Sequence, residues 1–258
     1  MRVRYNSGAM GSADLHIHTA LGDGMAEIPE VLAYVEEQTD LSVIAVTEHD
    51  DLRAAELARE AWARGSYKFE VVLGEEVTTL EGHILALFIE EPIEGLRPLE
   101  PTLEAIHKQS GLAIIPHPMS WLTRSVGQRT IERVLRQDSA GVSFDGMEHS
   151  VSPAARVTSK KAHRLNQERY HFAEVGGSDA HFLQAIGSSH TQFSGTSARD
   201  LRAAISSRET TVVSGRHPSL LQLGLGPVIR QQWRGILATP RQMGWLPTIS
   251  SFFRRVRP

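Results

Sequence analysis

The segment Asp14-Leu15-His16-Ile17-His18-Thr19 places two histidines at the end of a short apolar run, residues 13–17, for which we predict a β-strand. Side chains two positions apart on an extended chain lie on the same side, so the rings of His16 and His18 face the same way. Two ligands of one metal ion need this geometry. Such a strand end is the first indication of a metal site.

Short apolar runs alternate with amphipathic stretches from this segment to about residue 215. The predicted strands are residues 13–17, 42–46, 70–73, 83–89, 112–115, 146–148, 171–175 and 210–213. The predicted helices are residues 28–37, 52–64, 101–109, 130–136, 153–169 and 199–206. This alternation favours an α/β fold with a parallel sheet, closed or nearly closed. Functional side chains of such folds gather at the carboxyl ends of the strands.

The polar residues at the predicted strand ends are of few types. After the first strand they are Thr47-Glu48-His49-Asp50, Gly74-Glu75-Glu76, Gly82-His83, Pro116-His117-Pro118 and Ser178-Asp179-Ala180-His181. One histidine at such a place is usually a hydrogen-bonded structural residue. Six of the 12 histidines lie at strand ends, however, and a structural role explains so many poorly. The chain has no Cys, and imidazole with carboxylate suits Zn, Mn or Fe better than Mg.

These segments resemble, in order, the four motifs of the PHP (polymerase and histidinol phosphatase) superfamily, with a Gly-x-Glu between them. The resemblance covers about residues 13–215. It implies a distorted (β/α)7-type barrel and a centre of two or three divalent metal ions. It also implies a hydrolase, because most members are phosphoesterases.

Position by position, the resemblance implies nine metal ligands. The first metal would take His16, His18 and Asp179, and the second His83 and His117, with Glu76 bridging the two. A third would take His49, His181 and Asp23; the last stands in Gly22-Asp23-Gly24, where many members carry Ser-Asp-Gly.

Three neighbouring positions need separate interpretation. Glu76 fits the family's Gly-x-Glu spacing, and Glu75 remains the alternative. Asp14 is expected to orient His16 rather than to bind metal itself. Glu48 stands where the family commonly has Asp, a change that leaves His49 intact.

The expected reaction is attack of metal-activated water on phosphorus in a small phosphomonoester, a nucleotide or an oligonucleotide end. His49 or His181 could protonate the leaving oxygen. Many phosphatase members carry an Arg two residues after the His-Pro pair, where this chain has Ser120. Arg124 and His149 are the candidate substrate contacts, with Arg129 and Lys160-Lys161 as substitutes for the missing Arg. Of the other histidines, His107, His163, His171, His190 and His217 are assigned no role.

Two other functions stay open. One is a metal-dependent hydrolase of a non-phosphate bond, such as an amidase, because the phosphate-clamping Arg is missing. The other is a non-catalytic metal-binding module whose basic tail docks on nucleic acid or membrane.

The charge is distributed unevenly along the 258 residues. No acidic residue follows Glu209, whereas seven Arg do, so the preceding part carries 20 basic and 30 acidic side chains. We therefore predict a barrel over residues 13–215 and a basic, aromatic-containing extension over 216–258, which either packs on the barrel or contacts an anionic surface. There is no apolar stretch long enough to span a bilayer and no signal-peptide pattern at the start, so a cytoplasmic location is expected.

Overall fold

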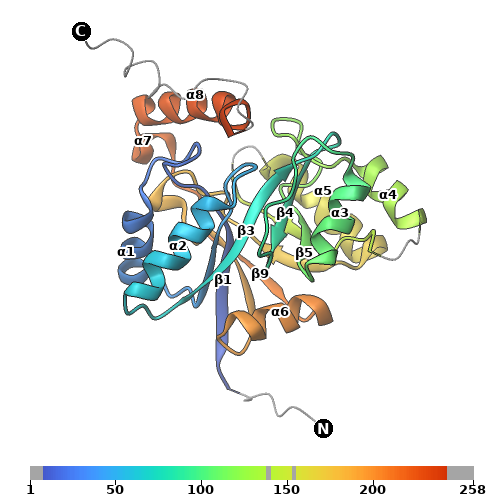
Figure 1. The fold of residues 1–258 in the computed structure, drawn as a ribbon, viewed down its shortest axis with the longest axis horizontal. Coiled ribbons are helices and arrows are strands. Elements are labelled where there is room, and N and C mark those ends of the chain that lie inside the picture. The colour runs from blue at the N-terminus through green and yellow to red at the C-terminus, as the bar shows by residue number, and fades with distance from the viewer. Residues whose placement is uncertain (1–7, 138–140, 153–154, 243–258) are drawn as a thin grey trace.

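The computed structural model describes residues 8–137, 141–152 and 155–242, which form one nine-stranded mixed sheet (Figure 1). Its strand order is β7-β6-β5-β4-β3-β2-β1-β8-β9. The strands are β1 (Met10–Ile17), β2 (Val43–Val46), β3 (Glu70–Thr78), β4 (His83–Leu87), β5 (Leu112–Ile115), β6 (Gly146–His149), β7 (Ala173–Gly176), β8 (Ser189–Ser194) and β9 (Thr211–Ser214).

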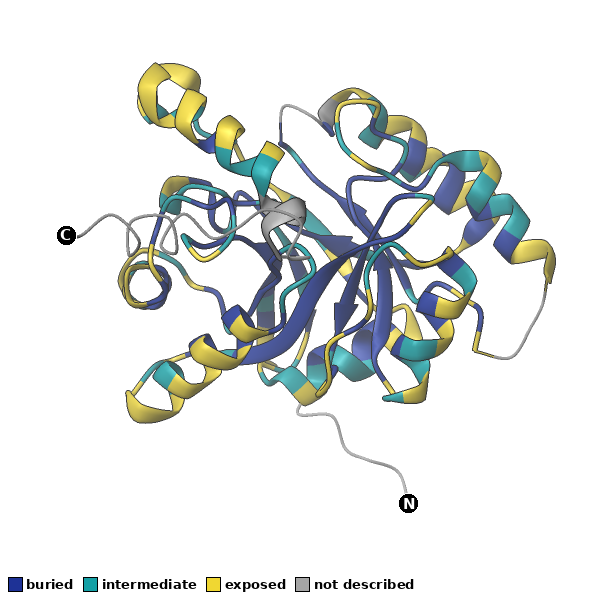
Figure 2. Cartoon of the chain, turned by 45° about the horizontal axis from the view of Figure 1, so that its top comes forward, coloured by how far each residue is buried: buried dark blue, intermediate teal, exposed yellow. Residues whose placement is uncertain are grey.

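Helices surround this sheet. They are α1 (Ile28–Gln38), α2 (Arg53–Arg64), α3 (Leu99–Lys108), α4 (Gln128–Gln137), α5 (Arg156–Leu165), α6 (Ala198–Ser207), α7 (Leu220–Leu223) and α8 (Leu225–Gln242). A π-helical turn, η1 (Asn166–Tyr170), continues α5, and a 3-10 turn, η2 (Leu183–Ala185), follows β7. Figure 2 shows the central strands of the sheet buried, whereas the surrounding helices expose one side; the edge strand β9 has no buried residue. Apolar residues between the sheet and its helices form the core, as Leu99, Leu103 and Ile106 of α3 do.

The predicted α/β barrel is confirmed, but its sheet is not purely parallel. The pairs β1–β2, β2–β3, β5–β6 and β6–β7 are parallel, and β1–β8, β3–β4, β4–β5 and β8–β9 are antiparallel. The physical reason is visible between β3 and β4, where the short turn at residues 79–82 replaces a crossover helix. A turn of this length can only reverse the chain direction.

The two edge strands of the sheet approach each other, so that the barrel nearly closes. The backbone N–H of Gly176 in β7 donates to Thr191 Oγ1 in β8 at 2.9 Å, and Thr210 Oγ1, just before β9, donates to the carbonyl of Glu174 at 2.7 Å. A Cβ on Gly176 would lie 2.3 Å from the carbonyl oxygen of His190. Glycine is therefore required at this seam, where side-chain hydroxyls stand in for a backbone ladder.

Strand β8 was not predicted from the sequence. Its buried positions are Ser189, Thr191 and Phe193, and two of these three are small polar residues. Since the prediction used apolar alternation, a strand that buries hydroxyls gave no signal. β3 was predicted too short for a related reason, because its second half carries Glu75 and Glu76.

The predicted extension begins with α7 and α8. The division at residue 215 stays a prediction. Trp245, Pro247, Phe252, Phe253 and the last three Arg lie outside the described residues. No helix in the described part of the chain is both long enough and apolar enough to cross a bilayer.

Candidate metal centre

The structure brings all nine predicted metal ligands together at one end of the barrel. The four overlapping groups, within each of which the ligand atoms lie within 4.8 Å of one another, are His16-Glu76-His117, His16-His18-Asp179, His49-Glu76-His83 and His18-Asp23-His49-His181. These side chains come from β1, β3, β4 and the loops after β1, β2, β5 and β7. We call the nine residues the central cluster.

Glu76 lies in the middle of the central cluster and is fully buried. Five imidazoles surround its carboxylate, at distances of 2.8 Å for His83 Nδ1, 2.9 Å for His117 Nε2, 3.1 Å for His49 Nδ1, 3.2 Å for His16 Nε2 and 3.5 Å for His18 Nε2. The first two are measured to Oε1 and the other three to Oε2. Each oxygen therefore faces a different set of rings, an arrangement suited to a carboxylate shared by two ions.

Glu75 faces the other side of β3, because successive strand residues alternate. Its Oε1 accepts the backbone N–H of Ile93 at 2.5 Å. Burial, with the nearby Asp50 and Asp51, raises the pKa of Glu75 to about 8. Burial alone would also raise the pKa of Glu76, but the surrounding His49, His83 and His16 lower it well below its usual range. Between the two glutamates, only Glu76 belongs to the central cluster.

Asp179 joins the two histidines of the first strand. Its Oδ1 lies 3.5 Å from His16 Nε2 and 3.5 Å from His18 Nε2. The backbone of Asp179 has φ 52°, and His117 at the end of β5 has φ 29°. Non-glycine residues adopt positive φ at a cost, and such residues concentrate at functional sites.

Asp23 holds the outer corner of the central cluster. Its Oδ2 lies 3.0 Å from His181 Nε2 and 3.9 Å from His49 Nε2. The same oxygen accepts from Gln231 Nε2 of α8 at 3.4 Å. Arg234, one turn further along α8, donates to the carbonyls of Ala20 and Gly22 at 2.5 and 2.9 Å. Hydrogen bonds from α8, near the carboxyl-terminal end of the described chain, therefore hold the loop that carries Asp23. In Figure 1, α8 lies over this end of the barrel.

Glu148 of β6 supports the cluster without having been predicted. Its Oε1 lies 2.8 Å from His16 Nδ1, and its Oε2 accepts the backbone N–H of His117 at 2.7 Å. A Cβ on Gly177 would lie 2.0 Å from Glu148 Oε1, so the glycine leaves room for this carboxylate. The available signal was strand alternation in Gly146-Met147-Glu148-His149, which puts Glu148 on the inner face and its two neighbours on the outer face.

The expectation that Asp14 orients His16 is corrected by these contacts. The carboxylate of Asp14 accepts the backbone N–H groups of Gly187 at 2.7 Å, Ser178 at 3.0 Å and His16 at 3.4 Å. It therefore fixes the backbone of β1 against the loop that carries Asp179, whereas Glu148 orients the ring of His16.

Several buried polar atoms of the central cluster have no hydrogen-bond partner. They include both ring nitrogens of His18, Nδ1 of His49, Nε2 of His83 and Oδ1 of Asp23. Leaving such atoms unpaired in a buried site is costly. Divalent ions among the imidazole and carboxylate groups would satisfy them, so these residues fit a metal centre.

His49 and His181, the two predicted proton donors, are the most exposed histidines of the central cluster. Their side chains are 14% and 18% exposed, compared with 8% or less for the other four. They therefore lie nearest to solvent, where a substrate would arrive.

The two predicted substrate contacts, Arg124 and His149, do not belong to the central cluster. Arg124 has an exposed side chain, and its carbonyl accepts the backbone N–H of His83 at 2.8 Å. It thus stands beside the cluster. His149 is not brought to the cluster: its ring meets that of His163, with the ring centroids 4.5 Å apart. The inner face of β6 carries Glu148, and His149 points to the other face.

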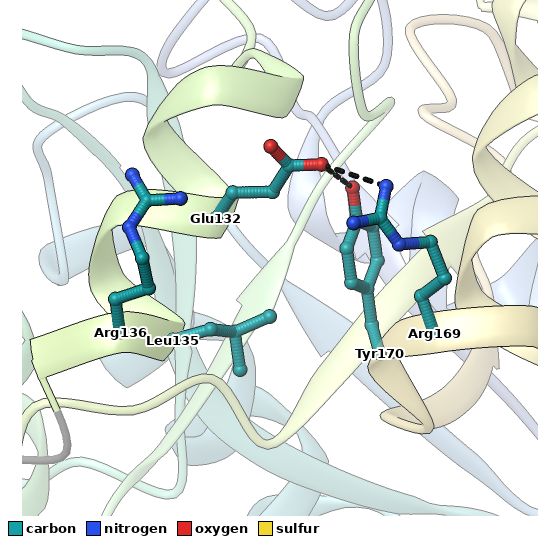
Figure 3. Close-up of a pocket in the computed structure, with 5 residues that line it drawn as sticks. All are labelled: Glu132, Leu135, Arg136, Arg169 and Tyr170. Atoms are coloured by element: carbon teal, nitrogen blue, oxygen red, sulfur yellow. Dashed lines mark hydrogen bonds and ion pairs between the residues drawn. The ribbon is translucent and has the colours of Figure 1, made fainter.

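A separate surface pocket lies between α4 and η1 (Figure 3). Glu132, Leu135, Arg136, Arg169 and Tyr170 line it. The carboxylate of Glu132 accepts from Arg169 at 3.2 Å and from the hydroxyl of Tyr170 at 3.4 Å. The pocket contains no residue of the central cluster.

Comparison with known proteins places this geometry in a family. A family model described as PHP-associated matches residues 161–210. An uncharacterized protein of Methanocaldococcus jannaschii is 37% identical over 131 residues, which are 46% of this chain and 75% of that protein. A 5'-3' exoribonuclease of Salmonella typhimurium is 33% identical over 81 residues, 30% of this chain and 27% of the exoribonuclease.

Among solved structures, the chain is similar to a two-domain protein of Bacteroides vulgatus containing a predicted PHP-like metal-dependent phosphoesterase. The TM-score is 0.59 at 18% identity, and the likeness covers 80% of this chain and 65% of that one. The order of motifs, the barrel and the matched PHP-associated region all agree with the resemblance to the PHP superfamily.

Proposed function

We propose that this protein is a metal-dependent phosphoesterase that hydrolyses a phosphate ester of a small molecule, a nucleotide or an oligonucleotide end. The observation that carries the proposal is the central cluster, in which six imidazoles and three carboxylates converge from loops and strands far apart in the sequence. Two or three divalent ions held there would supply an activated water and positive charge.

The charges of the central cluster favour an anionic substrate. Asp23, Glu76 and Asp179, with Glu148 beside His16 and Glu48 beside His18, carry five negative charges at most, fewer than the six positive charges of three divalent ions. Arg124, an exposed residue whose backbone carbonyl accepts the N–H of His83, is a candidate cation near the cluster. A phosphate ester is the substrate class that such a surplus of positive charge would bind.

His49 or His181, whichever is not fully committed to a metal ion, is proposed to transfer the proton to the leaving oxygen. Both lie on the exposed side of the cluster, and Asp23 Oδ2 holds His181 Nε2 at 3.0 Å. This contact fixes the ring orientation, as proton transfer requires.

The similarity to a 5'-3' exoribonuclease supports an oligonucleotide end within this substrate class. The likeness covers only 27% of that protein, so its activity as a whole is not carried over. The amidase-like alternative stays a prediction, since Ser120 stands where many PHP phosphatases carry a phosphate-binding Arg.

The test is hydrolysis by the full chain after chelation and reloading with Mn, Zn or Fe. The substrates are p-nitrophenyl phosphate, bis-p-nitrophenyl phosphate, nucleoside monophosphates, oligonucleotides phosphorylated at either end, and a matched set of anilides and carbamates. We expect metal-dependent phosphate release that is lost in Asp179→Asn. Turnover of anilides or carbamates without any phosphate release would contradict the proposal in favour of the amidase-like alternative.

A further inference from the structure

Three side chains outside the central cluster meet on the outer face of the sheet. His149 ends β6, Glu174 lies in β7 and His163 lies in α5. In the parallel pair β6–β7, Met147 is the register partner of Glu174, and His149 follows Met147 on the same face. His163 approaches this pair from α5, so three separate elements converge.

The distances among the three side chains suit a single ion. His163 Nδ1 lies 3.2 Å from His149 Nε2 and 3.0 Å from Glu174 Oε1, and all three atoms lie within 4.8 Å of one another. Ligand atoms of a tetrahedral zinc ion lie about 3.4 Å apart, because zinc bonds to nitrogen and oxygen are about 2.0–2.2 Å long. Little movement would be needed to seat an ion between them.

Hydrogen bonding alone satisfies this arrangement poorly. His163 Nδ1 faces both an imidazole nitrogen and a carboxylate oxygen, but a neutral ring nitrogen offers one proton or one lone pair. A proton on His163 Nδ1 has a single direction in the plane of its ring, so it cannot point well at both neighbours. A cation would accept a lone pair from all three atoms.

His149 is placed to act as a ligand. It is 8% exposed. Its Nε2 lies 3.2 Å from His163 Nδ1, so the ring presents a nitrogen to the other two side chains.

We propose that His149, His163 and Glu174 form a second divalent-cation site of the zinc type, outside the central cluster, with the fourth position left for water. Two imidazoles and one carboxylate are a donor set that zinc accepts. A bound ion would join α5 to the sheet. This inference does not depend on the proposed hydrolase function.

The experiment compares the zinc content of the full chain with that of His163→Ala and of Glu174→Gln. Each protein is dialysed against zinc, separated from unbound metal and measured by mass spectrometry. His107→Ala is the matched control, because His107 is also a partly exposed helix residue paired with a carboxylate, Asp145 at 2.9 Å, but it belongs to none of the ligand groups found. We expect one zinc fewer in both site variants and no change in the control.

A second measurement keeps the test independent of variant folding. Crystals of the unaltered protein soaked in zinc should give an anomalous peak between His149 Nε2, His163 Nδ1 and Glu174 Oε1. Equal zinc content in His163→Ala and the unaltered protein would overturn the inference. So would the absence of this peak in crystals whose central cluster is filled.

Discussion

The central cluster contains two groups of three residues that are built differently, and each is called a half here. His18, His117 and Asp179 are assigned to neither group. His16, Glu76 and His83 lie on β1, β3 and β4, and we call them the strand half. Asp23, His49 and His181 lie on loops, and we call them the loop half. Side chains of the strand half are 8% exposed or less, whereas His49 and His181 are 14% and 18% exposed.

The support for each half differs as well. Glu148, inside the barrel, orients His16 of the strand half. Gln231 and Arg234 of α8, more than 200 positions along the chain, hold the loop that carries Asp23. The strand half therefore depends on the barrel alone, and the loop half also depends on the carboxyl-terminal extension. Substitutions that affect one half and not the other test this difference.

The largest effect is expected for Glu76→Gln. Removing the charge at the centre of five imidazoles should empty the strand half and lower activity at least ~1000-fold, comparable with losing a main electrostatic contact to the reacting group. Metal content and phosphate release are the measurements. Glu75→Gln is the matched control, with the same change one residue away on the opposite face of β3, and it should keep its metal.

Glu75 itself should affect stability, with a defined pH dependence. Its pKa is raised from 4.5 to about 8 in the folded protein, so the folded state holds a proton that the unfolded state releases between these values. Stability is therefore lost as the pH rises from 4.5 to 8, by on the order of 4 kcal/mol. Glu75→Gln should remove this loss, which denaturant unfolding at pH 5 and pH 8 would reveal. An equal pH dependence in both proteins would contradict it.

Glu148→Gln is expected to weaken the strand half without emptying it. The substitution keeps an oxygen near His16 Nδ1 but removes the charge, and changes of this kind usually cost about 10- to 100-fold in metal affinity. Competition with a chelator measures the affinity. Glu132→Gln, a carboxylate on α4 that is paired with Arg169, serves as the control. A uniform loss in both halves would show that the halves are not separable.

The smallest effect is expected on α8. The double substitution Gln231→Ala with Arg234→Ala removes the contacts to Asp23, Ala20 and Gly22, and should lower the affinity of the loop half about 10-fold. The strand half should be unchanged. Arg230→Ala, an exposed Arg on the same helix, is the control. A metal titration that separates the weakest bound ion from the others would distinguish the two outcomes.

The sequence predicted much of the strand half because its signals are local. His16 lies at the end of an apolar run, and the choice of Glu76 over Glu75 rested on the Gly-x-Glu spacing of the family that the chain resembles. Glu148 was missed because strand alternation could place it on the inner face of β6 but does not show which ring it reaches. The role given to Asp14 was wrong for the same reason, since the sequence does not show which carboxylate reaches the ring.

The contact between α8 and the Asp23 loop could not be predicted either. Gln231 and Arg234 stand in a basic, aromatic-containing stretch whose composition fitted both packing on the barrel and contact with an anionic surface. Only the fold shows that this stretch turns back onto the protein's own centre. Strand β8 was missed because its inward side chains include Ser189 and Thr191 rather than apolar residues.

The seam between β7 and the strands β8 and β9 gives the barrel one line of weakness. Elsewhere neighbouring strands are joined by ladders of backbone hydrogen bonds, but here the hydroxyls of Thr191 and Thr210 make the hydrogen bonds between the strands. Asp179 follows β7 within a few residues, so a transient parting of this seam would carry a predicted metal ligand with it. Metal binding to the central cluster should therefore stabilise the closed form of the barrel at this seam.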